Sequence, residues 1–164
     1  MTEPGKGNPP AGATSSWEPR RRARRRALQA LYQREISGDP VDDIIVQFLE
    51  TQNFEGVDEA YFKRLVHGVD EQGEALTEEL QPLLDRPFRQ LDTMERILLL
   101  LGAWHFRFDP EVPFPVVVDE AVDLSQRFVS AQTHSYVNAV LDRAAHAWKL
   151  PGSETPGSGD AGDA

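Results

Sequence analysis

The apolar residues of this chain recur with a helical period over most of its length, and this pattern constrains the fold more than any other feature. Between residues 20 and 148 they follow one another at spacings of three and four, which places them on one face of an α-helix. Only Val116 to Val118 has the composition of a strand, and three residues without a partner cannot build a sheet. We therefore expect an all-α fold of about seven helices.

Turn residues divide this pattern into separate helices. Gly38 to Pro40 ends the first helix, and the three prolines within residues 109–115 exclude a helix over that loop. The most apolar segment follows Asp92, whose carboxylate can cap a helix while Glu95 reaches back to it, and we expect this segment to be the central core helix. The expected helices contain the apolar residues of 28–32, 41–49, 61–69, 76–84, 94–105, 121–128 and 136–148.

The two ends of the chain differ in composition from the middle. Residues 1–19 and 151–164 are rich in Pro, Gly, Ser and Thr and have little apolar periodicity. Such segments cannot bury enough surface to offset the entropy of ordering them. We expect two disordered tails around one helical domain at residues 20–150.

The chain offers few groups for catalysis. It has no cysteine, its four histidines occur singly without the spacing of metal ligands, and it lacks a glycine-rich phosphate loop. No segment approaches the roughly 20 consecutive apolar residues that span a membrane. We expect a cytoplasmic protein that is not an enzyme and needs no cofactor or metal.

Charge is distributed unevenly along the chain. The formal net charge is −10, but residues 1–35 carry +5 and the other residues carry −15. Six arginines stand within residues 20–26, at the expected start of the first helix. Positive charge there opposes the helix dipole by about 0.3–1 kcal/mol per charge, and like charges four residues apart repel. A bound polyanion relieves both effects, so we predict a nucleic-acid-binding surface whose arginine side chains lie outside the core.

Tyr136 is the aromatic residue best placed to support this surface. It lies early in the last expected helix, shortly after the polar link of residues 130–133. Single-stranded RNA is held by stacking of its bases on aromatic side chains beside a basic groove. The spacing is equally compatible with an ordinary core tyrosine, and both interpretations stay open at this point.

Five stretches of the chain, taken in order, match a known family. The last is the most specific, because its Tyr-Val-Asn-Ala-Val-Leu-Asp sequence is close to a Phe-Val-Asn-Gly-Val-Leu-Asp pattern. The stretches are Arg20 to Arg24 with Ala27 to Tyr32, Tyr61 to Val69, Met94 to Trp104, Val112 to Leu124 and Phe128 to Asp142. Together they resemble the bacterial transcription antitermination factor NusB family over about residues 20–148.

The resemblance implies an all-helical fold of two subdomains that binds the boxA element of ribosomal RNA leader transcripts. It also implies that the protein pairs with NusE, a small-subunit ribosomal protein, and joins RNA polymerase antitermination complexes. Tyr32 and Glu95 fall at positions similar to family contacts with NusE, although a capping role for Glu95 needs no partner. The RNA surface implied by the resemblance, with the further basic residue Arg25, consists of Arg20, Arg21, Arg22, Arg24, Arg25, Gln132 and Tyr136.

Two positions depart from the family pattern, and two other functions stay open. Gln132 stands where an acid is frequent, and Ala139 stands where glycine is frequent. One alternative function is a helical protein-interaction module without specific RNA binding. The other is a detached homologue of the RNA-binding domain of RNA cytosine methyltransferases, against which we count the absence of a cofactor domain after residue 150. Relatives include monomers and homodimers, so a homodimer is also an open expectation.

Overall fold

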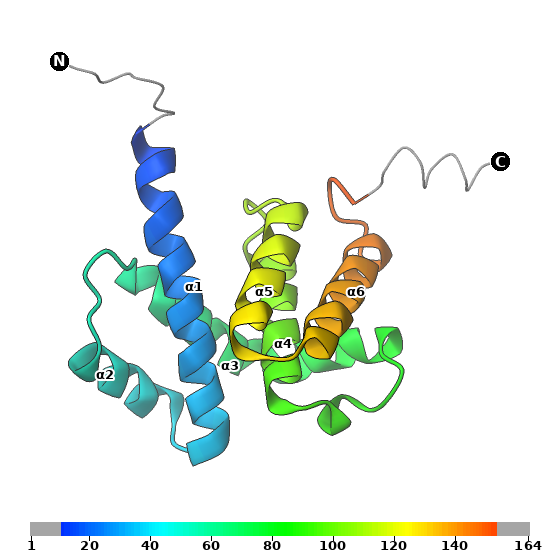
Figure 1. The fold of residues 1–164 in the computed structure, drawn as a ribbon, viewed down its shortest axis with the longest axis horizontal. Coiled ribbons are helices and arrows are strands. Elements are labelled where there is room, and N and C mark those ends of the chain that lie inside the picture. Colours follow the sequence, from blue (N-terminus) through cyan, green and yellow to red (C-terminus); the bar gives the residue numbers. More distant parts are fainter. Residues whose placement is uncertain (1–10, 154–164) are drawn as a thin grey trace. The chain divides into compact units, whose positions relative to one another are not determined.

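A computed structural model describes residues 11–153 of the chain (Figure 1). Over these residues it contains six α-helices, two single-turn 3-10 helices and no strand, which confirms the all-α prediction. The chain divides into two compact units, one up to Asp70 and one from Glu71 onward. The helices are α1 (Ala11–Ser37), α2 (Val41–Thr51), α3 (Glu59–Leu80), η1 (Gln81–Leu83), η2 (Phe88–Gln90), α4 (Thr93–Phe108), α5 (Phe114–Phe128) and α6 (Ala131–Ala147).

The first unit consists of α1, α2 and the first half of α3. Its core is apolar and aromatic: the rings of Phe48 and Phe62 stack with centroids 6.1 Å apart, and Phe54 meets Phe62 edge-on at 5.0 Å. Such ring pairs stabilise a core beyond the burial of their area. The α1 side of the core is formed by small and aliphatic residues at helical spacing, namely Ala23, Ala27, Leu28, Ala30 and Leu31.

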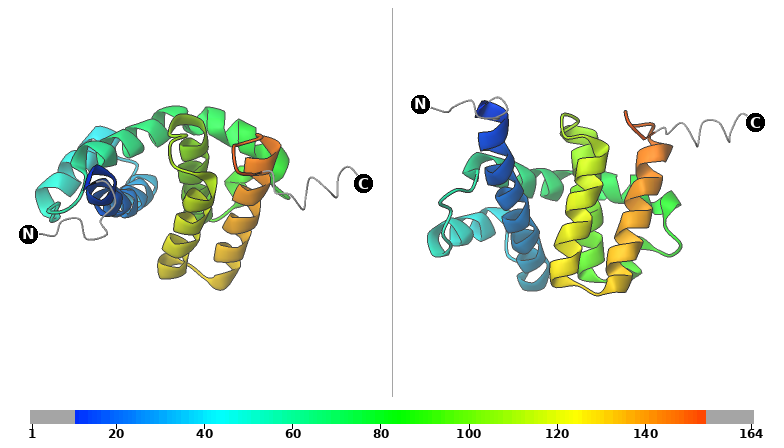
Figure 2. Two further views of the ribbon diagram at one scale, coloured as in Figure 1. Left: turned by 90° about the horizontal axis from the view of Figure 1, so that it is seen from above. Right: turned by 45° about the horizontal axis from the view of Figure 1, so that its top comes forward.

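The second unit is built around α4. The helices α4, α5 and α6 pack against one another in pairs (Figure 2). Nine of the residues from Ile97 to Phe106 in α4 are buried, so the prediction of a central core helix is confirmed. Gly102 lets α6 come close, because a Cβ atom added there would lie 2.7 Å from both terminal carbons of Leu141.

Three helix boundaries differ from those predicted. The predicted helices at 61–69 and 76–84 are not separate, because α3 continues from Glu59 to Leu80 through Gly73, which costs only about 1 kcal/mol relative to alanine. The end of the second predicted helix is the 3-10 helix η1. Proline is tolerated in the first turn, where its missing N–H has no intrahelical partner, so α5 begins at Phe114 and includes Pro115.

The third difference concerns the N-terminal tail. α1 begins at Ala11 rather than at Arg20, and it contains Pro19. Extending an existing helix is far easier than nucleating one, and the helix continues before Arg20 although Pro19 removes a helical hydrogen bond and crowds the preceding turn. Most of the predicted tails, residues 1–10 and 154–164, lies outside the described residues.

Two kinds of feature are absent from the described residues. No helix within residues 11–153 is long and apolar enough to cross a membrane. The same part of the chain contains no group of three or more His, Asp or Glu side chains arranged to hold a metal ion.

The close approach of α4 and α6 gives a stability prediction. We expect Gly102→Ala to destabilise the protein by about 1–3 kcal/mol, because the added methyl group must displace the fully buried Leu141. Gly73→Ala in α3 is the matched control: nothing lies within 4 Å of the added carbon, so it should stabilise by up to about 1 kcal/mol. Urea denaturation of both variants checks this, and equal stabilisation by both would contradict the proposed close contact.

Candidate nucleic-acid interface

Two of the arginines of α1, Arg20 and Arg24, contact Tyr61 of α3. The Arg24 guanidinium donates from Nη1 to the Tyr61 hydroxyl at 2.9 Å, and the Arg24 residue is only 6% exposed. The Arg20 guanidinium lies 4.5 Å from the centre of the Tyr61 ring and donates from Nε to Asp58 Oδ2 at 3.4 Å. Asp58 also caps the start of α3 by accepting from the Tyr61 N–H at 3.0 Å. Arg20 and Arg24 therefore join α1 to the beginning of α3.

The expectation that all the arginines lie outside the core is thus wrong for Arg24. Arginine can bury its long stem and its planar head where an aromatic ring and a hydroxyl receive them. Tyr61 supplies both groups. An alanine at position 24 would remove packing as well as charge, so it cannot serve as a clean test of RNA binding.

Two further arginines contact the segment between α2 and α3. Arg22 donates from Nη1 to the carbonyl oxygen of Gly56 at 3.2 Å, and its residue is exposed. Gly56 has a φ of +77°, a conformation that favours glycine, and a Cβ atom there would lie 2.7 Å from Arg22 Nη1. The Arg26 guanidinium lies 5.2 Å from the centre of the Phe54 ring.

Arg21 and Arg25 lie one helical turn apart, each next in sequence to an arginine that contacts Tyr61. Arg21 pairs with Glu18 at 3.8 Å, and its side chain is 32% exposed. Arg25 is half-buried. An ion pair of this length on the surface contributes little to stability and is readily exchanged for another anion. We call Arg21, Arg22 and Arg25 the basic face of α1.

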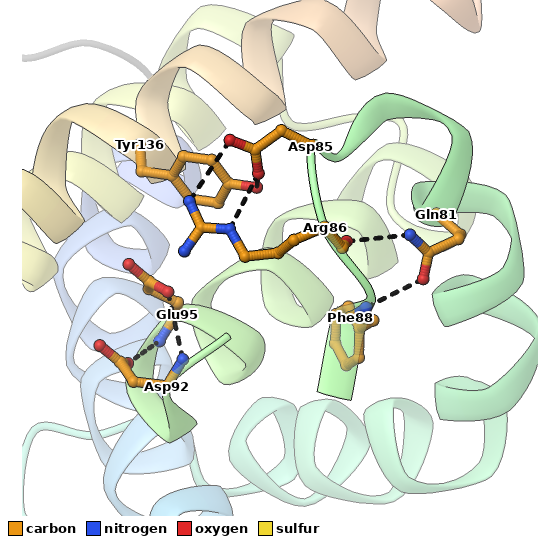
Figure 3. A network of polar contacts seen from close by, with 7 residues as sticks. All are labelled: Gln81, Asp85, Arg86, Phe88, Asp92, Glu95 and Tyr136. Atoms are coloured by element: carbon orange, nitrogen blue, oxygen red, sulfur yellow. Dashed lines mark hydrogen bonds and ion pairs between the residues drawn. The ribbon is translucent and has the colours of Figure 1, made fainter. Parts of the chain in front are cut away.

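Tyr136 lies in the second unit at one end of a polar cluster that includes Asp85 and Arg86 (Figure 3). Its hydroxyl donates to Asp85 Oδ1 at 3.1 Å, and the Arg86 guanidinium lies 4.9 Å from the centre of its ring. Arg86 in turn donates from Nε to Asp85 Oδ1 at 2.9 Å. Tyr136 is half-buried, so it is neither a fully exposed stacking platform nor an ordinary core tyrosine. Its ring lies at the surface with the Arg86 guanidinium over it.

The charges of this cluster are fixed at neutral pH. The hydrogen bond from Arg86, and next the one from Tyr136, lower the pKa of Asp85 from its usual value. Burial of the ring, and next the hydrogen bond to Asp85, raise the pKa of Tyr136. Asp85 therefore stays a carboxylate and Tyr136 stays a phenol that can donate its proton.

The turn that carries Arg86 is held by Gln81. The Gln81 side chain donates from Nε2 to the Arg86 carbonyl at 3.0 Å and accepts from the Phe88 N–H at 2.9 Å (Figure 3). Both ends of residues 86–88 are thus tied to η1. Sequence reasoning missed Asp85 and Arg86, because nothing near them along the chain pointed to Tyr136, 51 residues away from Asp85.

Glu95 forms the predicted capping box at the start of α4. Asp92 Oδ1 accepts from the Glu95 N–H at 2.9 Å, and Glu95 Oε1 accepts from the Asp92 N–H at 3.2 Å. The other oxygen, Oε2, accepts from the Thr133 hydroxyl of α6 at 3.3 Å. Both carboxylate oxygens of Glu95 therefore have partners within the second unit, so a protein contact there has to share or replace them.

The remaining predicted site residues are accessible. Gln132 is exposed in the first turn of α6, one turn before Tyr136. Tyr32 of α1 is 39% exposed. The predicted RNA-binding residues thus form two groups. The arginines belong to the first unit, and Gln132 and Tyr136 belong to the second.

The Tyr61 contacts lead to a second stability prediction. Tyr61→Phe keeps the ring over which Arg20 lies but removes the oxygen that receives Arg24, and we expect it to destabilise the protein by about 1–3 kcal/mol. Tyr32→Phe removes a hydroxyl from an exposed ring and should change the stability by less than about 0.5 kcal/mol. Urea denaturation of both variants measures their free energies of unfolding and checks this prediction. Equal stabilities for the two variants would show that the Tyr61 hydroxyl does not hold Arg24.

Comparison with known proteins gives consistent matches over most of the chain. The family model described as the NusB family matches residues 21–146. The transcription antitermination protein NusB of Xanthomonas oryzae pv. oryzae (strain PXO99A) is 44% identical over 151 residues, which cover 91% of this chain and 96% of that protein.

Two solved structures have a similar fold. T. maritima NusB is 26% identical with a TM-score of 0.70, over 78% of this chain and 91% of that one. A structure of the antitermination factors NusB and NusE in complex with dsRNA matches at 23% identity with a TM-score of 0.68, over 77% of this chain and 96% of that one.

Proposed function

We propose a function from one premise: this chain belongs to the NusB family of transcription antitermination proteins. On that premise the protein is an RNA-binding adaptor. It binds the boxA element of ribosomal RNA leader transcripts, together with NusE, and joins RNA polymerase complexes that resist termination. In this proposal the protein acts on nascent transcripts in the cytoplasm. It is not an enzyme, and it needs no cofactor.

The observation that carries this proposal is the basic face of α1 on an otherwise acidic protein. Residues outside 1–35 carry a formal charge of −15, which repels a polyanion, so RNA has to approach where cations are concentrated. Arg20 and Arg24 are engaged with Tyr61, whereas the contacts of the basic face are a long ion pair of Arg21 with Glu18 and an exposed hydrogen bond of Arg22 to the Gly56 carbonyl. Phosphate contacts of this kind supply affinity but no sequence information.

The second group, Gln132 and Tyr136, supplies contacts to bases. An aromatic ring stacks with any base, and an exposed amide can hydrogen-bond to base edges. The Arg86 guanidinium over the Tyr136 ring adds a planar cation on which a base can also stack. Asp85 repels phosphate next to the ring, which favours bases over backbone at this position.

NusE is the protein partner that we propose. The exposed Tyr32 offers an aromatic anchor of the kind enriched at protein interfaces, and Glu95 offers a carboxylate at the start of α4. A solved complex that contains NusB, NusE and dsRNA supports a test of both RNA and NusE as ligands. The RNA of that complex is double-stranded, whereas our proposal concerns a single strand. The experiments below therefore include a duplex.

The basic face leads to a prediction about salt dependence. Wild-type protein should bind labelled single-stranded boxA RNA with an affinity that falls as salt rises, and Arg21→Ala with Arg22→Ala should reduce the logarithmic slope by about 1.4, at about 0.7 per phosphate contact. The matched control, Lys63→Ala with Arg143→Ala, removes the same charge outside the basic face and should leave the slope unchanged. Fluorescence anisotropy at several salt concentrations measures both.

Other results of this titration contradict the proposal. A flat salt response of the wild-type protein would leave only a protein-interaction module. Equal slopes in the two double variants would place the RNA away from the basic face. Tighter binding of an RNA duplex than of the single strand would contradict base stacking as the source of affinity.

Tyr136 gives a prediction that separates the two ligands. Tyr136→Leu should weaken RNA binding by about 5- to 150-fold, the effect of losing one stacked base, while affinity for NusE stays the same. Tyr136→Phe keeps the ring and loses only the bond to Asp85, so it should retain most of the RNA affinity. Paired titrations with RNA and NusE check this. A larger loss of NusE affinity than of RNA affinity would refute the assigned role.

A further inference from the structure

Trp17 is a large aromatic side chain that the proposed RNA surface does not yet use. It lies in α1, one helical turn before Arg20 and Arg21, and it is 49% exposed. Single exposed apolar residues are common and need no explanation by themselves. The argument therefore depends on which side of α1 this residue occupies and on what surrounds it.

Helical geometry places Trp17 on the same side of α1 as two arginines of the basic face. Residues four apart on a helix differ in direction by only about 40°. Trp17, Arg21 and Arg25 follow one another at that spacing and form a continuous stripe. The stripe begins at the edge of the core-facing side of the helix, since the buried Arg24 and Leu28 stand seven and eleven residues after Trp17 and differ from it in direction by only about 20°. It turns away from that side toward Arg25.

The neighbours of Trp17 indicate the class of its ligand. An apolar docking site for a protein usually continues at i+3 and i+4 with further apolar residues, as in the exposed pair Tyr32 and Ile36. The residues at those positions after Trp17 are Arg20 and Arg21. An indole ring beside guanidinium groups is the combination that holds single-stranded nucleic acid, whose bases stack and whose phosphates need cations.

We propose that Trp17 stacks on a base of the RNA that the basic face of α1 holds, which extends the RNA-binding surface toward the N-terminus of α1. The residues at positions 17 and 21 are about 6 Å apart along the helix axis, a length that the base and phosphate of neighbouring nucleotides can span. The Glu18 carboxylate that now pairs with Arg21 at 3.8 Å gives way to the phosphate. This inference rests on the proposed RNA-binding function and assigns it a further residue.

The test compares substitutions that differ only in the aromatic ring. Trp17→Phe keeps a stacking surface and Trp17→Leu keeps only an apolar one. By anisotropy with labelled single-stranded boxA RNA, we expect Trp17→Leu to lose about fivefold or more in affinity and Trp17→Phe to lose less. The salt slope should stay that of the wild type in both, because no phosphate contact is removed. The matched control is Ile36→Ala, which changes the other strongly exposed apolar residue of α1, 65% exposed, and should bind RNA normally.

A spectroscopic measurement separates direct stacking from an indirect effect. Stacked bases quench indole fluorescence, so RNA should quench the wild-type protein more than Trp17→Phe, in which the buried Trp104 and the Trp148 beside Arg107 still emit. Equal quenching in both proteins would overturn the inference. Circular dichroism confirms that the helical content of each variant is unchanged.

The remaining outcomes distinguish this inference from the function on which it rests. Equal RNA affinity of Trp17→Leu and wild type, with a normal effect of the Arg21 and Arg22 substitutions, would overturn the role of Trp17 alone. A loss of NusE binding or of self-association in Trp17→Leu, without a loss of RNA binding, would assign the residue to a protein contact instead. Failure of the wild-type protein to bind RNA would overturn the proposed function itself.

Discussion

Tyr61 is the side chain on which the geometry of the arginine-rich helix depends. It lies almost fully buried near the start of α3, where its ring receives the Arg20 guanidinium and its hydroxyl receives Arg24. A buried guanidinium without such partners would be strongly destabilising. Because two arginines contact one tyrosine, they help to fix the rotation of α1 about its own axis, together with the buried apolar residues of the helix.

This arrangement gives part of one run of arginines a structural role. Arg20 and Arg24 contact Tyr61 and Asp58, whereas Arg21 pairs with Glu18 and Arg22 bonds to the Gly56 carbonyl. The rest of the chain is acidic, so it repels a polyanion, and the arginine-rich part of α1 is where a polyanion is attracted. Because α1 begins at Ala11, the arginines lie inside the helix, and the repulsion among them is offset partly by Tyr61 and Asp58.

In the second unit, residues near helix ends organise the site. The Glu95 carboxylate caps α4 with one oxygen and accepts from Thr133 of α6 with the other, so the starts of the two helices are linked. One turn further along α6, Tyr136 bonds to Asp85 while Arg86 covers its ring. The proposed stacking of a base here would meet side chains that already hold one another by hydrogen bonds, which reduces the entropy lost on binding.

The sequence by itself determined the all-α class, the capping box of α4 and the location of the positive charge, because each depends on residues within one or two helical turns. It also pointed to Tyr136 as an aromatic residue of interest. It did not show that Arg24 is buried or that Arg86 covers Tyr136. Those facts depend on contacts between residues 37 positions apart, for Arg24 and Tyr61, and 51 apart, for Asp85 and Tyr136. Only the tertiary structure decided them, since such partners meet only after the helices have packed and no local spacing records which face of a helix will be covered.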